Sequence, residues 1–517
     1  MPAMPRPSSS APGAVLAASL LIGLLLTPAR SAAQAPPTTT VEERLAGAVA
    51  DTIETGTFEG AFWGIHVVNL RTGEVLYSRN ADHHFVPASN VKLLTSAAGL
   101  EQLGPDYRYR TRVYLDGPVE DETLKGNLIV RGAGDPTIGG YEQREDPTQI
   151  FRRWADSLRQ RGITRIDGTI VGDDNRLDET PLGHGWSWSD ITYAYAAEIG
   201  GLVFHENTVD LQVDGRQVGQ PARISWDPFR TDYVTVVNRS RTVPYRDEED
   251  EEYQRIIGTN TIHVKSRLHP NGEDHEAISI SNPTLYFVDT LREVLLQEGI
   301  SVDGRAADLD ETALNVQYDS PSVRRVASYT SAPLAEIVQT LNHESQNLYA
   351  EQLLRTLAAE VPPETDEDLP PGSSPLGVEA VRRTLARAEV DTSRIQLVDG
   401  SGLSRQNLVR PRSLVRLLRY MWNHPEAEVS SAFYDSLPEG GRDGTLAYRF
   451  LGRSPARSNV RAKTGTLSNV SSLSGYVTSG AGAPLAFSVF CNHHMADGDQ
   501  VRSAQDVIVN TLARLPL

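Results

Sequence analysis

Residues 89–103 read SNVKLLTSAAGLEQL, and the interpretation of the whole chain starts from this stretch. Apolar residues such as Leu93 and Leu100 recur at the spacing of one helix face, which predicts a buried helix from about Ser89 to Leu103. Ser89 and Lys92 stand three positions apart at its start, a spacing that places both side chains on one face and within contact range.

A lysine beside a serine hydroxyl can remove the hydroxyl proton if its own pKa is lowered. An unshifted lysine is neutral in only about one part in 10^3 to 10^4 at pH 7, so burial or a second cation must bring its pKa to roughly 7–8. The chain has four lysines, and only Lys92 has a serine three positions before it. On its own, however, this spacing also recurs by chance in proteins.

Two further short motifs carry polar groups that could serve the same chemistry. Lys463-Thr464-Gly465-Thr466 opens a strand pattern, where a lysine can hold a carboxylate and a glycine permits close approach of a ligand. Ser345-Gln346-Asn347 falls inside a helical pattern predicted over Leu334–Ala358. Each of these motifs taken alone is equally well explained as a set of polar residues on the protein surface.

Composition excludes several classes of protein. The chain has 517 residues, 39% of them hydrophobic, and a formal net charge of −18, which argues against nucleic acid as a partner because phosphate binding needs a basic face. A single cysteine, Cys491, excludes a disulfide framework and a multi-cysteine metal site. The sequence has neither a His-Glu-x-x-His motif nor a nucleotide-binding Gly-Lys-Ser/Thr motif, so we expect no metal and no cofactor.

Residues 1–35 are predicted to be an export signal. Arg6 supplies positive charge, Ala14–Leu26 forms an apolar stretch, and Ala33-Gln34-Ala35 resembles a small-x-small cleavage site. The apolar stretch is shorter than the roughly 20 residues that span a bilayer. We therefore expect an exported protein of the periplasm or cell envelope, either soluble or loosely attached to a membrane.

Strand and helix patterns occur on both sides of a long middle region, whereas the middle region has a different pattern. Residues 61–80 predict a β-hairpin ahead of the first helix, and residues 472–491 predict two more strands followed by a closing helix over about 499–514. From about 108 to 325 the pattern changes to short alternating strands separated by turns.

The three motifs together are far more specific than any one of them. Ser-x-x-Lys, Ser-x-Asn and Lys-Thr-Gly in this chain order resemble the motif set of class A β-lactamases and penicillin-binding proteins. The sequence is most similar to the low-molecular-mass class C penicillin-binding proteins, which are D-alanyl-D-alanine carboxypeptidases and endopeptidases. It shares with them a long separation of the first two motifs, here 256 positions from Ser89 to Ser345, and the signature Asp399-Gly-Ser-Gly-Leu-Ser-Arg405. Gln346 departs from the family's usual aspartate.

This resemblance implies an α/β fold, with a transpeptidase-like domain in which a helix cluster packs against an antiparallel sheet. The expected catalytic domain is discontinuous and comprises residues 36–107 and 325–517. Residues 108–324 would form a large β-rich insertion of two domains, one nested in the other.

The resemblance also implies a role for each motif residue. Ser89 would be the nucleophile, Lys92 the acylation base, Ser345 a proton relay and Asn347 a ligand of both Lys92 and the substrate amide. Lys463 would bind the terminal carboxylate of the substrate and help to lower the pKa of Lys92. The neighbouring positions that would bind substrate are Thr464, Gly465 and Thr466. Backbone amides of Ser89 and Thr466 would form an oxyanion hole.

A second pair of residues is expected to bind the far end of a diaminopimelate side chain. Asp173 and Arg405 align with the family positions for this task, and a carboxylate beside a guanidinium suits a zwitterionic amino-acid head. A structural salt bridge, or unrelated surface groups, would explain these two residues as well.

The expected partners are therefore peptidoglycan stem peptides ending in D-Ala-D-Ala, with β-lactam antibiotics as covalent inhibitors. Two alternatives stay open on the sequence. A β-lactamase would share the motifs and differ in how fast its acyl-enzyme is hydrolysed. A non-catalytic peptidoglycan-binding protein would keep the fold without the reaction.

Overall fold

The structure is a computed structural model that describes residues 40–228, 231–364 and 369–517. The predicted export signal, residues 1–35, lies outside the described residues. The expected α/β class is confirmed, with a helix cluster packed against an antiparallel sheet. No helix within the described ranges is both long enough and apolar enough to cross a membrane.

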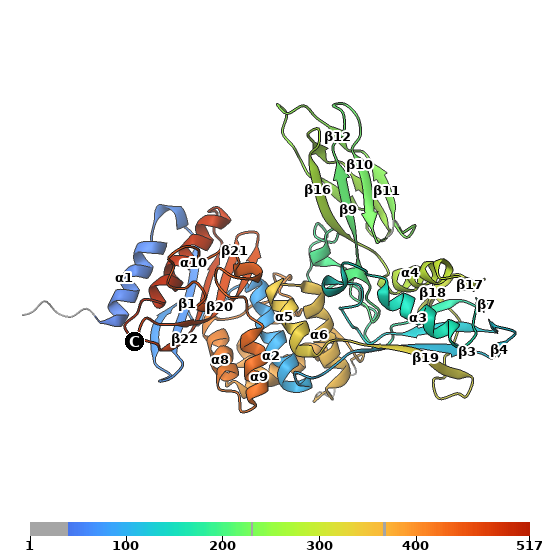
Figure 1. The fold of residues 1–517 in the computed structure, drawn as a ribbon. Coiled ribbons are helices and arrows are strands. Elements are labelled where there is room, and N and C mark those ends of the chain that lie inside the picture. Colours follow the sequence, from blue (N-terminus) through green and yellow to red (C-terminus); the bar gives the residue numbers. More distant parts are fainter. Residues whose placement is uncertain (1–39, 229–230, 365–368) are drawn as a thin grey trace, which may run out of the picture. The chain divides into compact units, whose positions relative to one another are not determined.

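A five-stranded antiparallel sheet joins the two ends of the chain. Its order is β2-β1-β22-β21-β20, and β1 pairs with β22 so that Ile65 lies opposite Val489. The bounds are β1 Phe62–Asn69, β2 Val75–Arg79, β20 Val460–Leu467, β21 Val470–Thr478 and β22 Pro484–Asn492. On one face lie α1, Val41–Ile53, and α10, Gly498–Leu512 (Figure 1). Strand β20 is left at the edge of the sheet.

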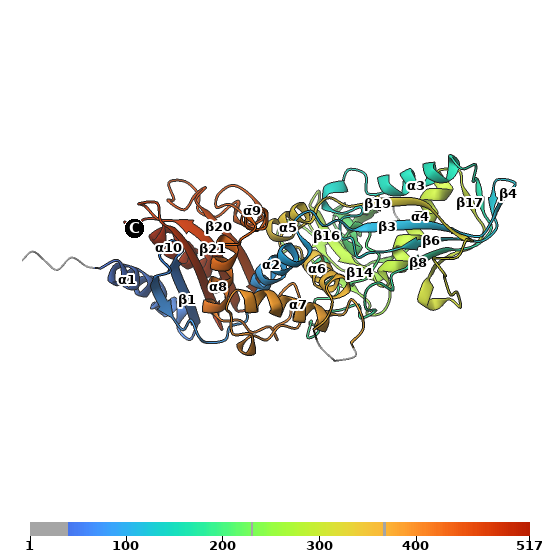
Figure 2. The ribbon, with the colours of Figure 1, turned by 90° about the horizontal axis from the view of Figure 1, so that it is seen from below.

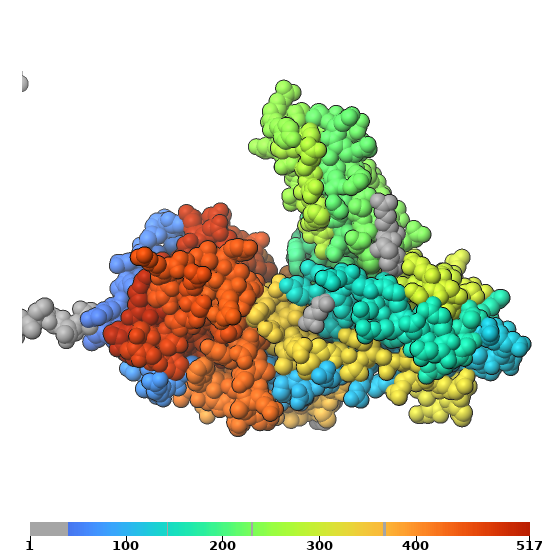
Figure 3. Space-filling model, viewed as in Figure 1, coloured from blue at the N-terminus to red at the C-terminus, as the bar shows by residue number. Residues whose placement is uncertain are grey.

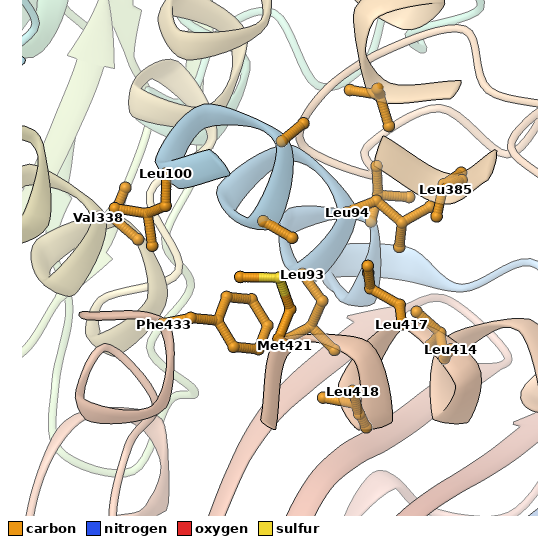
Figure 4. Packing of buried hydrophobic residues seen from close by; sticks show 14 of the residues in the cluster. Leu93, Leu94, Leu100, Val338, Leu385, Leu414, Leu417, Leu418, Met421 and Phe433 are labelled. Carbon is orange, nitrogen blue, oxygen red and sulfur yellow. The ribbon is translucent and has the colours of Figure 1, made fainter. Parts of the chain in front are cut away.

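The opposite face of the sheet carries a cluster of helices centred on α2, Val91–Leu103. All ten positions from Val91 to Leu100 are buried, because neighbouring helices surround α2. Figure 4 shows Leu93 of α2 among side chains that include Met421 and Phe433. The surrounding helices are α5 Leu334–His343, α6 Asn347–Glu360, α7 Ser374–Arg387, α8 Pro411–Trp422 and α9 Ala427–Asp435. The packing on every side holds the start of α2, and with it Ser89 and Lys92, in a fixed position.

The single helix predicted over Leu334–Ala358 is wrong at its centre. Helix α5 ends at His343 and α6 begins at Asn347, with Ser345 between them at φ 60°. A left-handed residue cannot continue a right-handed helix, so the chain breaks at the Ser345-Gln346-Asn347 motif. The apolar periodicity runs through both helices and does not reveal this break.

The segment between α2 and α5, which we call the inserted region, contains a five-stranded sheet with the order β18-β8-β6-β3-β19. Figure 2 shows β19, β3, β6 and β8 side by side. The bounds are β3 Arg110–Asp116, β6 Asn127–Arg131, β8 Ile170–Asp173, β18 Ala306–Asp308 and β19 Val323–Thr330. A smaller sheet consists of β4 Val119–Glu120, β5 Thr123–Leu124, β7 Arg165–Ile166 and β17 Ser301–Val302. The expected boundary at 324/325 falls inside β19, which pairs with β3 as far as Thr330.

Two helices in this region were not predicted, α3 (Gln149–Arg159) and α4 (Pro283–Gln297). Helix α3 buries Phe151, Trp154 and Leu158 at helical spacing, so the signal was present among the strand patterns. The region therefore contains two helices besides its strands β3 to β19.

Between β8 and α4 in the sequence lies a further group of strands, drawn in green in Figure 3. Two of its sheets have the orders β10-β9-β16 and β11-β14-β13, and β12 pairs with β15. The bounds are β9 Thr208–Asp214, β10 Arg223–Asp227, β11 Thr235–Asn238, β12 Arg241–Thr242, β13 Tyr253–Arg255, β14 Thr261–Val264, β15 Arg267–Leu268 and β16 Glu273–Ser279. We call these β9–β16 strands the outer strands. They share no strand with the sheet that contains β8.

Candidate active site

Ser89 lies in a single 3-10 turn, Ala88–Asn90, immediately before α2. Backbone from two distant segments closes around it. A Cβ atom on Gly402 would stand 1.9 Å from the Ala88 carbonyl oxygen, and one on Gly465 would stand 3.0 Å from the Ser89 amide nitrogen. Both positions therefore need glycine so that the two segments can approach the serine.

Lys92 is the immediate neighbour of the Ser89 hydroxyl. Its Nζ lies 3.0 Å from Ser89 Oγ, 2.5 Å from Asn347 Oδ1 and 2.8 Å from the Ser401 carbonyl oxygen. A neutral amine has two N–H groups and one lone pair. Since Asn347 and Ser401 offer acceptor oxygens for the two N–H groups, the lone pair is left to accept the Ser89 proton.

The surroundings of Lys92 favour that neutral form. Its side chain is fully buried, and burial lowers its pKa from 10.5 to about 7, against the opposing effect of the buried carboxyls of Asp399 and Glu351. At neutral pH a large fraction of Lys92 is therefore able to act as a base.

Those two carboxyl groups shape the loop that presents Ser401 and Gly402. Asp399 accepts hydrogen bonds from the amides of Gly402 and Ser404, and Glu351 accepts from the Ser401 amide. Burial raises the pKa of both carboxyl groups. The Asp399–Arg405 signature thus builds one wall of the site, and Glu351 on α6 supports it. Sequence reasoning did not find Glu351, which has no motif of its own.

The break between α5 and α6 places Ser345 and Asn347 beside the two motif lysines. Ser345 Oγ lies 2.8 Å from Lys463 Nζ, and Asn347 accepts from Lys92. Asn347 Nδ2 also donates 2.6 Å to the carbonyl oxygen of Tyr195, in the inserted region. These two hydrogen bonds determine which way the Asn347 amide points. Tyr195 is a second contributor that sequence reasoning missed, because a backbone carbonyl leaves no trace in a motif.

The Lys463-Thr464-Gly465-Thr466 motif lies on the edge strand β20. Asn90 Nδ2 donates a 3.1 Å hydrogen bond to the Lys463 carbonyl oxygen, and this bond connects the strand to the Ser89 turn. Burial, and secondarily the charge of Lys92, lower the pKa of Lys463 well below its usual value. Thr464 is partly buried, and its hydroxyl donates to that of Thr445, 2.9 Å away. Thr466 is exposed at the rim.

These groups open into a cleft of about 510 Å³. Its lining combines the three motifs with residues of the inserted region and of the Asp399–Arg405 loop: Ser89, Gly185, Ser187, Ser189, Asp190, Tyr195, Ser345, Asn347, Gly402, Leu403, Arg405, Thr466, Leu467 and Ser468. Lys92 and Lys463 are completely buried behind this lining. The cleft therefore presents the Ser89 hydroxyl to a bound molecule, with two buried amines nearby.

Of the two residues expected to bind the far end of a diaminopimelate side chain, Arg405 lines the cleft and Asp173 does not. Asp173 ends strand β8, where it is buried against Tyr318, whose hydroxyl donates to it, and lies 3.6 Å from Arg131. Arg405 lies in the cleft, where its guanidinium donates to the Ser468 carbonyl. The carboxylate that lines the cleft with Arg405 is Asp190. The sequence alone does not show which acidic side chain reaches the cleft, because that depends on how the chain folds around it.

Within the described ranges, one group of carboxyls could hold a metal ion. Oxygens of Asp174, Asp308 and Asp310 lie within 4.8 Å of one another, in the inserted region. Burial raises the pKa of Asp174 to about 7, and Thr284 donates a hydrogen bond to it. This group does not line the cleft.

Comparison with known proteins gives a consistent result. The sequence profile of the D-Ala-D-Ala carboxypeptidase 3 (S13) family matches residues 45–515. The D-alanyl-D-alanine carboxypeptidase of Actinomadura sp. (strain R39) is 33% identical over 473 residues, which cover 89% of this chain and 83% of the relative. The crystal structure of penicillin binding protein 4 (dacB) from Haemophilus influenzae matches with a TM-score of 0.77 and 23% identity, over 91% of this chain and 99% of that one. The same Haemophilus protein complexed with a β-lactam matches with a TM-score of 0.69 and 22% identity, over 90% and 98%.

Proposed function

We propose that Ser89 is the nucleophile of a serine-peptidase reaction. The chain belongs to the D-Ala-D-Ala carboxypeptidase 3 (S13) family, a family of serine peptidases. The observation that carries the assignment is the arrangement around Lys92 Nζ. Its Nζ lies 3.0 Å from Ser89 Oγ and within hydrogen-bond distance of two acceptor oxygens, which can take both N–H groups of the neutral amine. The substrate is the D-Ala-D-Ala end of a peptidoglycan stem peptide.

In the acylation step, Ser89 Oγ bonds to the carbonyl carbon of the penultimate D-alanine while its proton passes to Lys92 Nζ. The C–N bond then breaks, and the proton held by Lys92 passes by way of Ser345 to the departing amine, which leaves Lys92 neutral again; Ser345 is hydrogen bonded to Lys463. Water next attacks the acyl-serine, its hydroxyl remaining on the peptide and its proton returning to Ser89. Backbone amides of Ser89 and Thr466 stabilise the oxyanion, a contribution that is typically about 3–4 kcal/mol per donor.

We propose that Lys463, Thr464 and Thr466 hold the terminal carboxylate. Lys463 lies on the edge strand, next to Ser345, and its pKa is lowered by burial. A bound carboxylate would favour the charged form of Lys463 and reverse part of that shift. Substrate binding and protonation of Lys463 are therefore linked.

Asp190 and Arg405 are suited to bind the side chain of the stem peptide's third residue. They bring a carboxylate and a guanidinium to the same cleft, which matches the ammonium and carboxylate of a zwitterionic diamino acid. This pair replaces the one that was expected from sequence.

The geometry favours a peptidase over the two alternatives. In a class A β-lactamase, a glutamate in the site activates the water that hydrolyses the penicilloyl-serine. Glu351 and Asp399 are buried, and their carboxyl oxygens accept hydrogen bonds from backbone amides. Among the described residues that line the cleft, the one carboxylate is Asp190. We therefore infer that a penicilloyl group stays on Ser89. A non-catalytic binding protein would not need the buried lysine base.

We also propose that the protein acts outside the cytoplasm, on peptidoglycan, and that it can cleave cross-links as an endopeptidase as well as trim stem peptides. Residues 1–35 support export by their charge and apolar pattern. We further propose a discontinuous catalytic domain, its second segment starting after β19 rather than at residue 325.

Mass spectrometry after penicillin treatment tests the assignment. We expect one covalent adduct on the peptide that contains Ser89, and no adduct in the Ser89→Ala variant. The assignment is overturned if the adduct forms on another residue, or if the folded wild-type chain takes up no penicillin.

A further inference from the structure

A second hollow lies beside the catalytic cleft. This neighbouring hollow has a volume of about 600 Å³, and Ser189 lines both it and the cleft. Trp188 and Tyr193 form one part of its wall, and Glu252 and Ile257, from the outer strands and their connections, form another. We call this second hollow the distal groove. It contains none of the motif residues, so the proposed hydrolysis leaves it unexplained.

Apolar side chains in the distal groove face solvent. Trp188 is 75% exposed and Ile257 is 63% exposed, although both are large hydrophobic residues. The Tyr193 ring stacks on that of Tyr195, with centroids 5.6 Å apart and planes 11° apart, and Tyr195 lines the catalytic cleft. Exposed aromatic rings that form one surface with a cleft are typical of a binding site, because the ring faces offer flat apolar area to a ligand.

The charges of the distal groove are paired within the protein. Lys265 Nζ lies 2.6 Å from Glu252 Oε1 and also donates to the Gln254 side chain. Arg255 is buried, where it donates to the Ile191 carbonyl and lies 3.5 Å from Glu198. The groove therefore carries balanced charge, and the chain as a whole is at −18. Such a surface suits a neutral ligand with hydroxyl and amide groups and does not suit a polyanion.

We propose that the distal groove binds the glycan strand of peptidoglycan. This inference rests on the proposed function, because it takes the cleft to hold the stem peptide. A stem of about four extended residues spans roughly 13 Å, so the sugar that bears it lies beyond the cleft. That sugar carries no free acid, because its lactyl carboxyl is in an amide bond with the peptide. Trp188 and Tyr193 stack on the apolar faces of the sugar rings, and Gln254 and Glu252 bind hydroxyl and N-acetyl groups.

Two substrates separate the glycan contribution from the peptide reaction. The first is a free pentapeptide ending in D-Ala-D-Ala, and the second is the same pentapeptide attached to glycan strands. We expect Trp188→Ala and Ile257→Ser each to raise KM for the glycan-attached pentapeptide about five- to tenfold. Neither variant should change hydrolysis of the free pentapeptide or the rate of penicillin acylation. Tyr245→Ala is the matched control, because Tyr245 is 71% exposed and does not line the groove.

A binding measurement gives a readout that does not depend on catalysis. Ser89→Ala should sediment with glycan strands whose stem peptides have been removed by an amidase and whose freed lactyl carboxyls have been converted to methylamides, and the double variant Ser89→Ala, Trp188→Ala should not. If Ser89→Ala fails to bind these strands, or if both groove variants act on the two substrates as wild type does, the glycan inference is wrong while the peptidase assignment stands. Absence of penicillin acylation in wild type would instead remove the assignment on which the inference rests.

Discussion

Asn347 Nδ2 donates a 2.6 Å hydrogen bond to the backbone carbonyl of Tyr195, so the inserted region orients a side chain of the catalytic cleft. The other end of the same amide, Oδ1, accepts from Lys92 Nζ. Because an amide has a donor end and an acceptor end, the Tyr195 carbonyl turns the oxygen toward Lys92. The insertion thus acts on the site directly, through one carbonyl group.

Replacing Asn347 by aspartate tests this relationship. Asn347→Asp puts a negative charge beside Lys92 and removes the donor to Tyr195, so we expect the pKa of Lys92 to rise and less of it to be neutral at pH 7. Penicillin acylation at pH 7 should fall at least tenfold, and the midpoint of its pH profile should move upward. An unchanged midpoint in a folded Asn347→Asp variant would show that this amide does not control Lys92.

The pH dependence of acylation follows from the buried Lys92. Its pKa is about 7, and the neutral amine is the base, so the second-order rate of penicillin acylation should rise with pH through about 7 and then level off. Lys92→Arg keeps a cation that cannot lose its proton, and we expect acylation to fall roughly 10^2- to 10^4-fold at every pH. A rate that is flat between pH 5 and pH 9 in wild type would contradict the role of Lys92 as base.

Gly402 tests how tightly the Asp399–Arg405 loop packs on the nucleophile. It has φ +85°, and an added Cβ would lie 1.9 Å from the Ala88 carbonyl oxygen. We expect Gly402→Ala to displace the Ser89 turn and lower acylation more than 100-fold. Gly452→Ala is the control, with φ +67° and nothing within 4 Å of the added Cβ. It should lose about 1 kcal/mol of stability by thermal melting and keep full acylation. Equal acylation in the two variants would be the contrary result.

Arg405 tests the binding of the stem-peptide side chain. With Arg405→Met, we expect kcat/KM to fall about 10- to 100-fold for a stem peptide that has a free zwitterionic diamino acid, because one partner of its charged head is lost. The rate for the same peptide with its side-chain amine and carboxylate blocked should change little. Arg246→Met is the control, since Arg246 is highly exposed and pairs with Asp247. A similar loss on both peptides would point to a structural role for Arg405.

Much of the catalytic region could be predicted from local pattern. The hairpin at 61–80, the helix after Ser89 and the last two strands all have strong periodicity, and the structure contains β1, β2, α2, β21 and β22 there. Helix α3 was missed although it buries Phe151 and Trp154 at helical spacing. Its amphipathic pattern is short and lies between strand patterns, which hid it. The break at Ser345 was missed because side-chain periodicity carries no information on one residue's φ angle.

The sequence by itself determined which residues are candidates for the chemistry, because the Ser89–Lys92 spacing, Ser345 with Asn347, and Lys463 form recognisable short motifs. Tertiary structure decided what those residues can do. The lowered pKa of Lys92 comes from burial under helices that lie hundreds of residues away, and Asp190 rather than Asp173 reaches the cleft. Burial and long-range contact arise only when distant segments pack together, so no local stretch of sequence contains them.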